Sequence, residues 1–416
     1  MPILAGCASS EDIQPNAPDA EKQEVASRFR NVQEIIDLAQ QCAGGFTSEN
    51  PHSRGPLRTV DKSKVFPITT SISRSADTDE LPLIYIVQYE NDEGFAVIAT
   101  PKDAEPVLAV IDSGAYNDST ANSNPGFKYF MDWAKDYVNS VATMKIGSGG
   151  LTDSIIKNPD PPLKFTEFEE YTDTLAYLIR KPSIVNNRGQ DYPEGYLCPN
   201  LVSGCVPTAI FMACEYFQEP SFVITTYDNT KTKILINWKS LQNIRSVSRK
   251  VANFYKYQLT AAALPIATLA RQIGHVGNAT YGETTTSVEK SKILGTIKQI
   301  LPNRQATELG KYPMTDLVDI IRNYGLIICC SSCIDGDGGH AWVADGMNYL
   351  RTVTTRRIRE QGQTKWTILD TSYYDRLYLH YNFGWNGQCN GDFIYNEKVK
   401  TTEHTYSNDI MFISIK

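Results

Sequence analysis

The chain has 416 residues, which is enough for two or three domains and at least one large hydrophobic core. Apolar residues make up 41% of the sequence and aromatic residues 10%, as in folded globular proteins. The formal net charge is −7 and there is no long run of Lys and Arg. This argues against nucleic acid as the main partner, because phosphate binding needs clustered positive charge. No apolar run approaches the roughly 20 residues that a membrane-spanning helix needs.

The first residues predict a lipid anchor. Leu4-Ala5-Gly6-Cys7 is similar to the lipobox, at which bacterial lipoprotein signals are cut before a lipidated cysteine. Several acyl chains on Cys7 would hold the protein on a membrane surface without spanning it. We therefore expect a bacterial cell-envelope protein, anchored at the outer membrane or cell surface, or a secreted one. Residues 1–24 would be a signal remnant and a polar tether; the alternative is an incidental cysteine near the N-terminus.

Residues 25–145 have the pattern of a small α+β domain. A helix is predicted where apolar residues recur every three or four positions, and strands where short apolar runs are bounded by turn residues. Asn91-Asp92-Glu93-Gly94 separates two such runs and is a strong hairpin signal. The predicted order is a helix over 25–42, strands over 81–90, 94–100 and 105–114, and a helix that Pro125 opens and that extends to 144.

The rest of the chain is predicted to be a linker and a second, larger domain. Residues 146–180 begin Gly/Ser-rich and become Pro-rich, as expected of an exposed segment open to activating cleavage. Residues 181–416 place helical patterns before strand patterns, which indicates a helical half packed on an antiparallel sheet. The helices are predicted over 204–217 and 259–274, and the strands over 325–332, 340–347, 364–372, 376–385 and 409–415.

The nine cysteines and five histidines do not follow a metal-binding pattern. Cys330 and Cys333 form the only CxxC pair, and no HExxH motif occurs. We therefore expect neither a metal site nor a cofactor.

Cys205 is the cysteine whose surroundings favour reactivity. A cysteine at this place is a small core residue, half of a disulfide, a metal ligand or a nucleophile. Pro207 is tolerated only in the first turn of a helix, so the helix begins within about two residues of Cys205. The unpaired N–H groups and the dipole at a helix N-terminus favour thiolate. Gly204 removes side-chain bulk where a substrate backbone would approach.

A thiolate nucleophile needs a base, and His340 is the best candidate among the histidines. It opens a predicted strand directly after Asp-Gly-Asp-Gly-Gly, so its ring is expected at a sheet edge among small residues. The other four lie in polar segments, after a helix, or inside an apolar strand where packing is the commoner role: His52, His404, His275 and His380.

The base needs a group that holds its tautomer, and the oxyanion needs donors. Asn382 lies on a strand just before a Gly-Trp turn, where its amide oxygen can accept from His340 and Trp385 can shield that bond. Asp345 is a rival, but strand alternation places it on the face opposite to His340. The Cys205 N–H and the Gln190 side chain are the candidate oxyanion donors.

At these positions the sequence resembles the streptopain-like cysteine peptidases, bacterial relatives of the papain fold. The matching stretches are "SGCVPTAIFMACEYFQEP", "GGHAWVADG", which contains Gly339 and His340, "HYNFGWNGQCNGDF" and "RGQDYPEGYLCP". The resemblance implies a papain-like catalytic domain with Cys205 as nucleophile, His340 as base, Asn382 as its orienting residue and Gln190 as oxyanion donor. It also implies a zymogen whose inhibitory prodomain is residues 25–145, and a hydrophobic preference two places before the cut.

Four positions depart from the family pattern. Phe383 replaces a Trp after the orienting Asn, so a ring remains but its N–H is lost. Pro207 replaces a small residue, Asn386 a glycine, and Arg188 an aromatic residue two places before Gln190. None is a reacting group, so the departures concern the shape of the cleft and its substrate preference.

The sequence thus predicts a cysteine endopeptidase made as a zymogen, secreted or anchored to the cell surface. Its expected partners are protein or peptide substrates, its own prodomain, an activating protease (itself or another) and, through a lipid anchor only, the membrane. Two alternatives are a transacylase that uses the same Cys-His chemistry and a non-catalytic surface lipoprotein that only binds protein or glycan.

Overall fold

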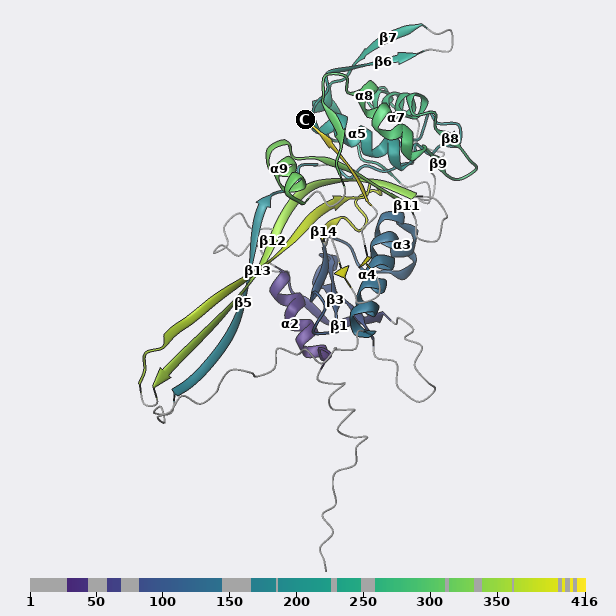
Figure 1. Cartoon of the computed structure of the whole chain (residues 1–416). Coiled ribbons are helices and arrows are strands. Elements are labelled where there is room, and N and C mark those ends of the chain that lie inside the picture. The colour runs from purple at the N-terminus through teal and green to yellow at the C-terminus, as the bar shows by residue number, and fades with distance from the viewer. Residues whose placement is uncertain are drawn as a thin grey trace, which may run out of the picture.

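A computed structural model shows two lobes that share one sheet, with a long three-stranded arm beside them (Figure 1). No helix among the described residues is long and apolar enough to cross a membrane. The structure describes residues 28–43, 58–68, 82–143, 166–184, 186–225, 230–247, 259–310, 314–332, 339–360, 363–395, 399–400, 405–406 and 410–416.

The N-terminal lobe is an antiparallel meander covered by helices, as the sequence predicts. The hairpin at Asn91-Asp92-Glu93-Gly94 is confirmed, and Gly94 is required there because a Cβ would lie 1.9 Å from the carbonyl oxygen of Ile111. The first helix begins later than predicted, because the Asn31 side chain caps the backbone N–H of Glu34. The elements are α2 (Val32–Cys42), β1 (Val60–Ile68), β2 (Ile84–Tyr89), η1 (Glu90–Asp92), β3 (Phe95–Ala99), β4 (Val107–Ile111), α3 (Asp118–Ser123) and α4 (Pro125–Thr143).

The C-terminal lobe has helices that precede the sheet, which confirms the predicted α+β class and the order of its two halves. Its helical half contains α5 (Cys205–Tyr216), β6 (Ser221–Thr225), β7 (Lys231–Leu235), α6 (Trp238–Leu241), α7 (Leu264–Val276), β8 (Thr280–Tyr281), β9 (Thr286–Ser287) and α8 (Lys290–Ile300). The sheet half contains β10 (Ala306–Glu308), α9 (Met314–Tyr324), β11 (Ile327–Ser332), β12 (Gly339–Glu360), β13 (Thr367–Asn382), β14 (Gly391–Ile394), β15 (Val399–Lys400), β16 (Thr405–Tyr406) and β17 (Met411–Ile415).

One antiparallel sheet runs through both lobes. Its strand order is β1-β2-β3-β4-β14-β13-β12-β11-β17-β10, and the lobes join where β4 pairs with β14. Phe127 and Phe130 of α4 reinforce this junction, since both rings pack on Phe393 of β14. The N-terminal lobe is therefore built into the same sheet and core as the C-terminal lobe.

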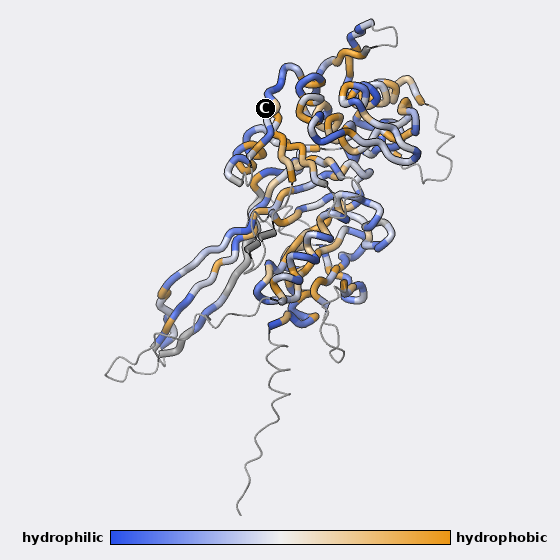
Figure 2. Tube along the Cα trace, turned by 45° about the vertical axis from the view of Figure 1, so that its right-hand side comes forward, coloured by the Kyte–Doolittle hydropathy of each residue, from blue (hydrophilic) through white to orange (hydrophobic). Residues whose placement is uncertain are grey.

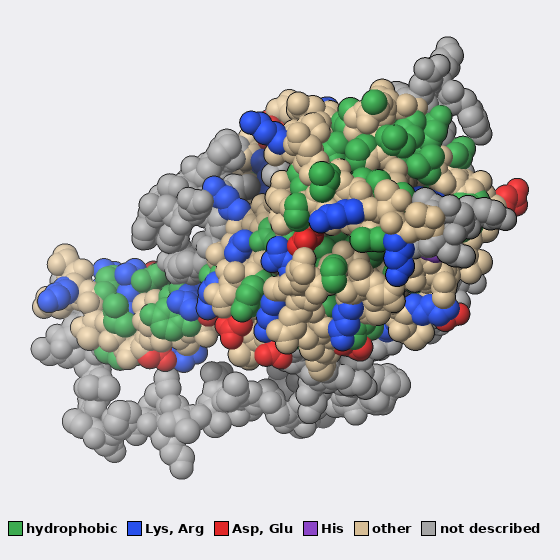
Figure 3. Space-filling model, turned by 90° about the horizontal axis from the view of Figure 1, so that it is seen from above, with side chains coloured by type: hydrophobic (Ala, Val, Ile, Leu, Met, Phe, Trp, Pro, Cys, Tyr) green, Lys and Arg blue, Asp and Glu red, His purple; other side chains and the backbone are tan. Residues whose placement is uncertain are grey.

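The arm consists of β5 (Thr166–Arg180) and the distal parts of β12 and β13. The sequence predicts a linker over 166–180, a strand that ends at 347 where β12 continues to Glu360, and two strands over 364–372 and 376–385 where β13 is one. Polar and hydrophobic residues are mixed along the arm, and β13 is exposed from Thr367 to Asp375, so the regular apolar alternation that marks a strand is missing (Figure 2). Ion pairs join its strands, among them Arg351–Asp375, Arg356–Glu170 and Arg357–Glu169. Hydrophobic and basic side chains lie side by side along it (Figure 3).

The two faces of β11 and β12 belong to two different hydrophobic cores. Side chains alternate along a strand, so neighbours point in opposite directions. Cys329 and Trp342 pack in the first core, which contains α4 and β2–β4, whereas Cys330 and Ala341 pack in the second core, which contains α5, α7 and α8. This alternation decides where each candidate site residue points.

Candidate active site

Cys205 is the first residue of α5, as the sequence predicts. The residue before it, Gly204, has φ +92°, and a Cβ there would lie 2.7 Å from the carbonyl oxygen of Thr286, so only glycine fits. Of the seven described cysteines, Cys205 alone is not buried. Burial raises the thiol pKa of the other six, Cys42, Cys198, Cys214, Cys329, Cys330 and Cys389. Cys205 is therefore the described thiol that a reagent can reach most readily.

The loop that carries Gln190 is fastened to the start of α5. The backbone N–H of Ser203 donates to the carbonyl oxygen of Gln190 at 2.8 Å. The Thr208 hydroxyl reaches the carbonyl oxygens of Gly204 at 2.8 Å and Gly189 at 3.3 Å, and lies 3.0 Å from the Ser203 hydroxyl. The structure thus brings Gln190 and Cys205 together. The sequence analysis missed the roles of Ser203 and Thr208, whose only signal is a pair of hydroxyl residues flanking the cysteine.

Arg188 anchors the same loop through a buried ion pair. Its guanidinium donates two bonds to the carboxylate of Glu215 on α5, from Nε to Oε2 at 2.8 Å and from Nη2 to Oε1 at 2.5 Å. A third bond reaches the carbonyl oxygen of Ile244 at 2.9 Å, and the guanidinium lies over the Phe211 ring. The aromatic residue expected at this position is therefore replaced by a cation that binds a carboxylate on the nucleophile helix.

His340 lies in the first core, on the face of β12 that also carries Trp342. Its ring stacks on Trp342, and its Nε2 lies 2.9 Å from the carbonyl oxygen of Phe383. A carbonyl oxygen only accepts, so Nε2 carries the proton. Burial lowers the pKa of His340 to about 4, with the Phe383 bond opposing this. The imidazole is therefore neutral near pH 7.

The N-terminus of α4 covers His340. A Cβ on Gly126 would lie 2.1 Å from the Phe383 ring and 2.9 Å from Cδ2 of His340, so the helix backbone touches both side chains. Asn124 caps α4 through its Oδ1 and donates its Nδ2 to the carbonyl oxygen of Gln388 at 2.8 Å. The N-terminal lobe thus holds both His340 and the loop after Asn382.

The structure does not bring His340 to Cys205. The sequence analysis expects the thiol and the imidazole to face each other, but Cys205 packs against the second core and the His340 ring lies in the first. For the full chain this expectation is wrong, because α4 fixes the ring on the other face of the sheet. Asn382 is buried, and its Oδ1 accepts from the Gly384 N–H at 3.1 Å. Trp385 does contact the His340 ring, edge to face at 6.2 Å between centroids.

Asp345, the rival of Asn382, binds a different histidine. Its Oδ1 lies 2.6 Å from Nδ1 of His380, and its Oδ2 accepts from the backbone N–H groups of Ser183 and Ile184. The other ring nitrogen of His380 lies 2.8 Å from Oδ2 of Asp112 in the N-terminal lobe. Burial alone would lower the pKa of His380, but the two carboxylates outweigh it and raise that pKa well above 6.5. His380 is therefore a buried cation that joins the two lobes.

Metal ligands do not gather in the part of the chain that the structure describes: it holds no group of three His, Cys, Asp or Glu side chains placed to bind an ion. Cys7, His52, His404 and Cys333 lie outside the described residues.

The Arg188–Glu215 pair predicts a large and asymmetric effect on stability. Because both side chains are buried, Glu215→Gln removes the carboxylate that the guanidinium binds directly and leaves only Glu194, 3.8 Å away, so we expect a loss of about 3–5 kcal/mol in the free energy of unfolding. Urea denaturation of the full chain measures it. As a control, Arg356→Gln breaks an exposed arm pair and should change the free energy of unfolding far less, because solvent screens exposed charges. Equal effects of the two variants would contradict the anchoring role.

Two family models match the chain, and together they cover both lobes. The model of the Peptidase C10 family matches residues 187–393, and that of the Spi protease inhibitor matches residues 31–138. The first contains the candidate nucleophile, base and oxyanion positions. The second spans the elements from α2 to α4, which include the helix that covers His340.

Among solved structures, the chain is similar to a fragment of prointerpain A from Prevotella intermedia in which one cysteine is mutated to alanine. The match has 17% sequence identity and a TM-score of 0.48, and covers 81% of this chain and 96% of that one. A search of curated protein sequences gives no match. The chain belongs to the Peptidase C10 family of cysteine peptidases and carries its own inhibitor-like prodomain.

Proposed function

We propose that the protein is the latent precursor of a cysteine endopeptidase in which Cys205 is the nucleophile, His340 the base, Asn382 its orienting residue and Gln190 the oxyanion donor. The observation that supports this proposal is that only part of the candidate site is assembled in the full chain. Gln190 and Cys205 lie together at the start of α5, while the inhibitor-like lobe holds His340 on the opposite face of the sheet.

Latency follows from the position of one imidazole. His340 is neutral, buried and bound to the Phe383 carbonyl, so this imidazole is not placed to take the thiol proton. Departure of α4 removes the backbone that presses on His340 and Phe383. For the Nε2–H to reach the Asn382 amide oxygen, the start of β12 must then turn the imidazole from the first core to the face of the sheet that carries Asn382 and Cys205. Nδ1 is then free to take the thiol proton.

In the active form the four residues act in the order that acyl transfer requires. The Cys205 thiol gives its proton to Nδ1 of His340, and the sulfur attacks the peptide carbonyl. The Cys205 N–H and the Gln190 amide stabilise the oxyanion. The imidazolium then protonates the leaving amine, and the acyl-enzyme remains. A water molecule, deprotonated by His340, hydrolyses the thioester and restores the thiol.

We also propose, from the sequence, that the protein is exported to the cell envelope. The lipobox-like Leu4-Ala5-Gly6-Cys7 supports export and lipidation of Cys7, and thus anchoring at the cell envelope. Protein substrates and an activating protease would then be met outside the cytoplasm.

Replacing the two reacting groups tests the assignment. In material activated by limited proteolysis, Cys205→Ala and His340→Ala should each lower casein hydrolysis by at least about a thousandfold, because each removes a reacting group. His275→Ala, an exposed histidine outside the site, should leave the rate unchanged. Hydrolysis of casein by Cys205→Ala would contradict the assignment of Cys205 as the nucleophile. Products in which a peptide is joined to an added amine would indicate a transacylase. A protein that neither cleaves casein nor labels with a thiol-directed probe would be a binding protein.

The arm narrows the expected activation site. Backbone hydrogen bonds hold β5 in a ladder with β12, and a protease needs an extended segment free of such bonds. We therefore expect the cuts that separate the prodomain to fall within 144–165, a narrower range than 146–180. N-terminal sequencing of the active form checks this. A mature N-terminus beyond residue 166 would contradict it.

The contact between His380 and Asp112 predicts a pH-dependent attachment of the prodomain. Since the pKa of His380 is raised above 6.5 in the joined state, its contribution is full below about pH 6.5 and is lost as the pH rises through the raised value. Asp112→Asn removes one of the two charges. Thermal unfolding of the Cys205→Ala full chain should show a lower Tm for Asp112→Asn at pH 6, with the difference shrinking towards pH 10.

Asp103→Asn, an exposed carboxylate of the same lobe, is the matched control and should leave Tm unchanged at both pH values. The neighbouring Asp392, whose pKa burial raises to about 7, titrates in all three proteins. Asp112 is one of the charges that raise this pKa, so Asp112→Asn also changes the titration of Asp392, and the comparison is made at pH 6 and pH 10, on either side of it. A Tm difference for Asp112→Asn that is constant with pH would show that the charge of His380 does not hold the lobes together.

A further inference from the structure

A polar cavity lies beside the candidate site, between the Gln190 loop and the turn that follows Asn382. Its volume is about 640 Å³. The turn and the loop touch: the Asn386 N–H donates to the carbonyl oxygen of Arg188 at 2.9 Å, and a Cβ on Gly189 would lie 2.2 Å from Oδ1 of Asn386. One wall of the cavity is therefore the peptide segment directly before Gln190.

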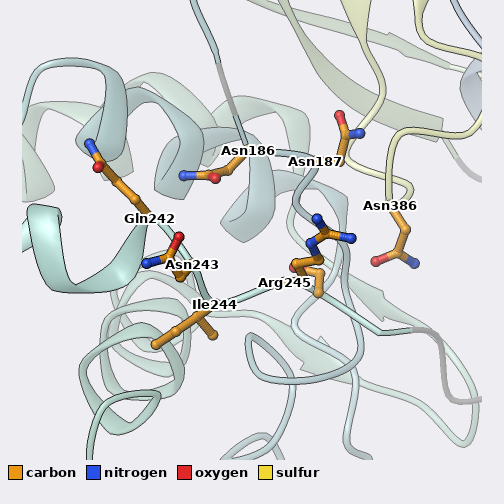
Figure 4. A pocket seen from close by; sticks show the side chains of 8 residues that line it. Asn186, Asn187, Gln242, Asn243, Ile244, Arg245 and Asn386 are labelled. Carbon is orange, nitrogen blue, oxygen red and sulfur yellow. The ribbon is translucent and has the colours of Figure 1, made fainter.

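The lining of the cavity is rich in hydrogen-bond donors and carries one guanidinium. Neither a carboxylate nor an aromatic ring is among the residues that line it. Figure 4 shows the Arg245 guanidinium directed towards the space between Asn187 and Asn386. The polar side chains that line the cavity are Asn186, Asn187, Gln242, Asn243, Arg245, Ser246 and Asn386.

The walls of the cavity are held from behind by the buried Arg188 network. Asn186 donates to Glu215 at 2.6 Å, the Ile244 carbonyl accepts from Arg188 at 2.9 Å, and the Ser246 hydroxyl donates to Glu194 at 2.6 Å. Asn386 has φ +56°, a conformation that Asn tolerates better than most residues, and its Oδ1 is buried against Gly189. Its amide nitrogen is thus the end left for a ligand.

The charge of Arg245 is not neutralised locally. Arg245 is exposed, and among the described residues it makes no ion pair or hydrogen bond. Glu215 is already paired with Arg188, and burial raises the pKa of Glu194 to about 7, so neither carboxyl offsets the guanidinium fully. The Asn and Gln amides of the lining also carry carbonyl oxygens, but the guanidinium repels a metal cation and the lining has no carboxylate to offset it. An apolar or ring-shaped ligand would need an apolar surface. The lining fits a ligand that is anionic and accepts hydrogen bonds.

We propose that this cavity is a substrate subsite that binds an acidic side chain, Asp or Glu, of the peptide held at Cys205. Arg245 is the counter-ion of the carboxylate, and the amides of Asn187 and Asn386 are its donors. The inference rests on the proposed function, because it takes the bound ligand to be a peptide substrate. A peptide whose scissile carbonyl lies by Gln190 would reach the cavity within a few residues. The subsite would give the proposed peptidase a preference for an acidic residue at one position of its substrate.

A peptide library tests the subsite. The activated protein is incubated with peptides of random sequence, and mass spectrometry reports the residues around each cut. We expect Asp and Glu to exceed Lys and Arg at one position by about three- to fivefold, the size of a partly exposed charge pair. Fluorogenic peptides that differ only in Glu or Lys at that position then give the ratio of kcat/KM values.

The ratio of kcat/KM values for the Glu and Lys peptides is then measured for two variants of Arg245 and one control variant. Arg245→Glu should reverse it in favour of Lys, and Arg245→Gln should bring it close to one. Lys239→Glu makes the same charge change on the exposed side of α6, outside the cavity, and should leave both the ratio and the rate on a neutral peptide unchanged. No acidic preference in the wild type, or equal shifts in Arg245→Glu and Lys239→Glu, would overturn the subsite.

The same library separates this failure from failure of the proposed function. Cys205→Ala should leave the library intact. Cleavage by Cys205→Ala, or none by the wild type, overturns the peptidase assignment and the subsite with it, whereas cleavage that depends on Cys205 without an acidic preference overturns the subsite alone.

Discussion

The alternation of side chains along β12 is the constraint on which the rest of the structure depends. His340 and Trp342 point towards α4, and Ala341 points towards α5, so the imidazole and the thiol of Cys205 lie on opposite faces of one sheet. Sliding the strand by one residue would exchange the faces, but β12 is paired with β11 from Gly339 to Ala344, with β13 from Val343 onward and with β5 from Met347 onward. The change that activation needs is therefore local to the start of β12, where Gly339 gives the backbone its freedom.

The inhibitory lobe is an integral part of the sheet as well as a cover for the site. β4 extends the sheet at β14, α4 packs its aromatic rings on Phe393, and Glu105 binds both Tyr374 and Arg376 at the base of the arm. Its removal uncovers the edge of β14 and part of the aromatic core at once. Latency and stability of the full chain therefore share the same contacts, and a change that weakens one weakens the other.

The sequence predicted the elements with strong local signals and missed those that depend on distant partners. Pro207 and Gly204 fixed the start of α5, and Asn91-Asp92-Glu93-Gly94 fixed the hairpin, because these residues restrict their own backbone. The polar strands of the arm have no such signal, since ion pairs with distant strands hold them.

The candidate site divides in the same way. The neighbourhood of Gln190 and Cys205 follows from local chain contacts, and the sequence identified both residues. The placement of His340 follows from a helix more than 200 residues earlier, and the sequence gives no sign of which face its ring occupies in the full chain. The same holds for Asp345, whose partner His380 and bridge to Asp112 join three separate segments.

The direction of β5 has a consequence for maturation. Thr166 pairs with Glu360 at the tip of the arm, and the strand runs from there back to the body of the protein (Figure 1). A cut just before this strand would create a chain end at the tip, remote from α5, the helix that begins at Cys205. Extra or missing residues at that end would therefore lie far from α5, because Thr166 pairs with Glu360 at the outer end of the arm.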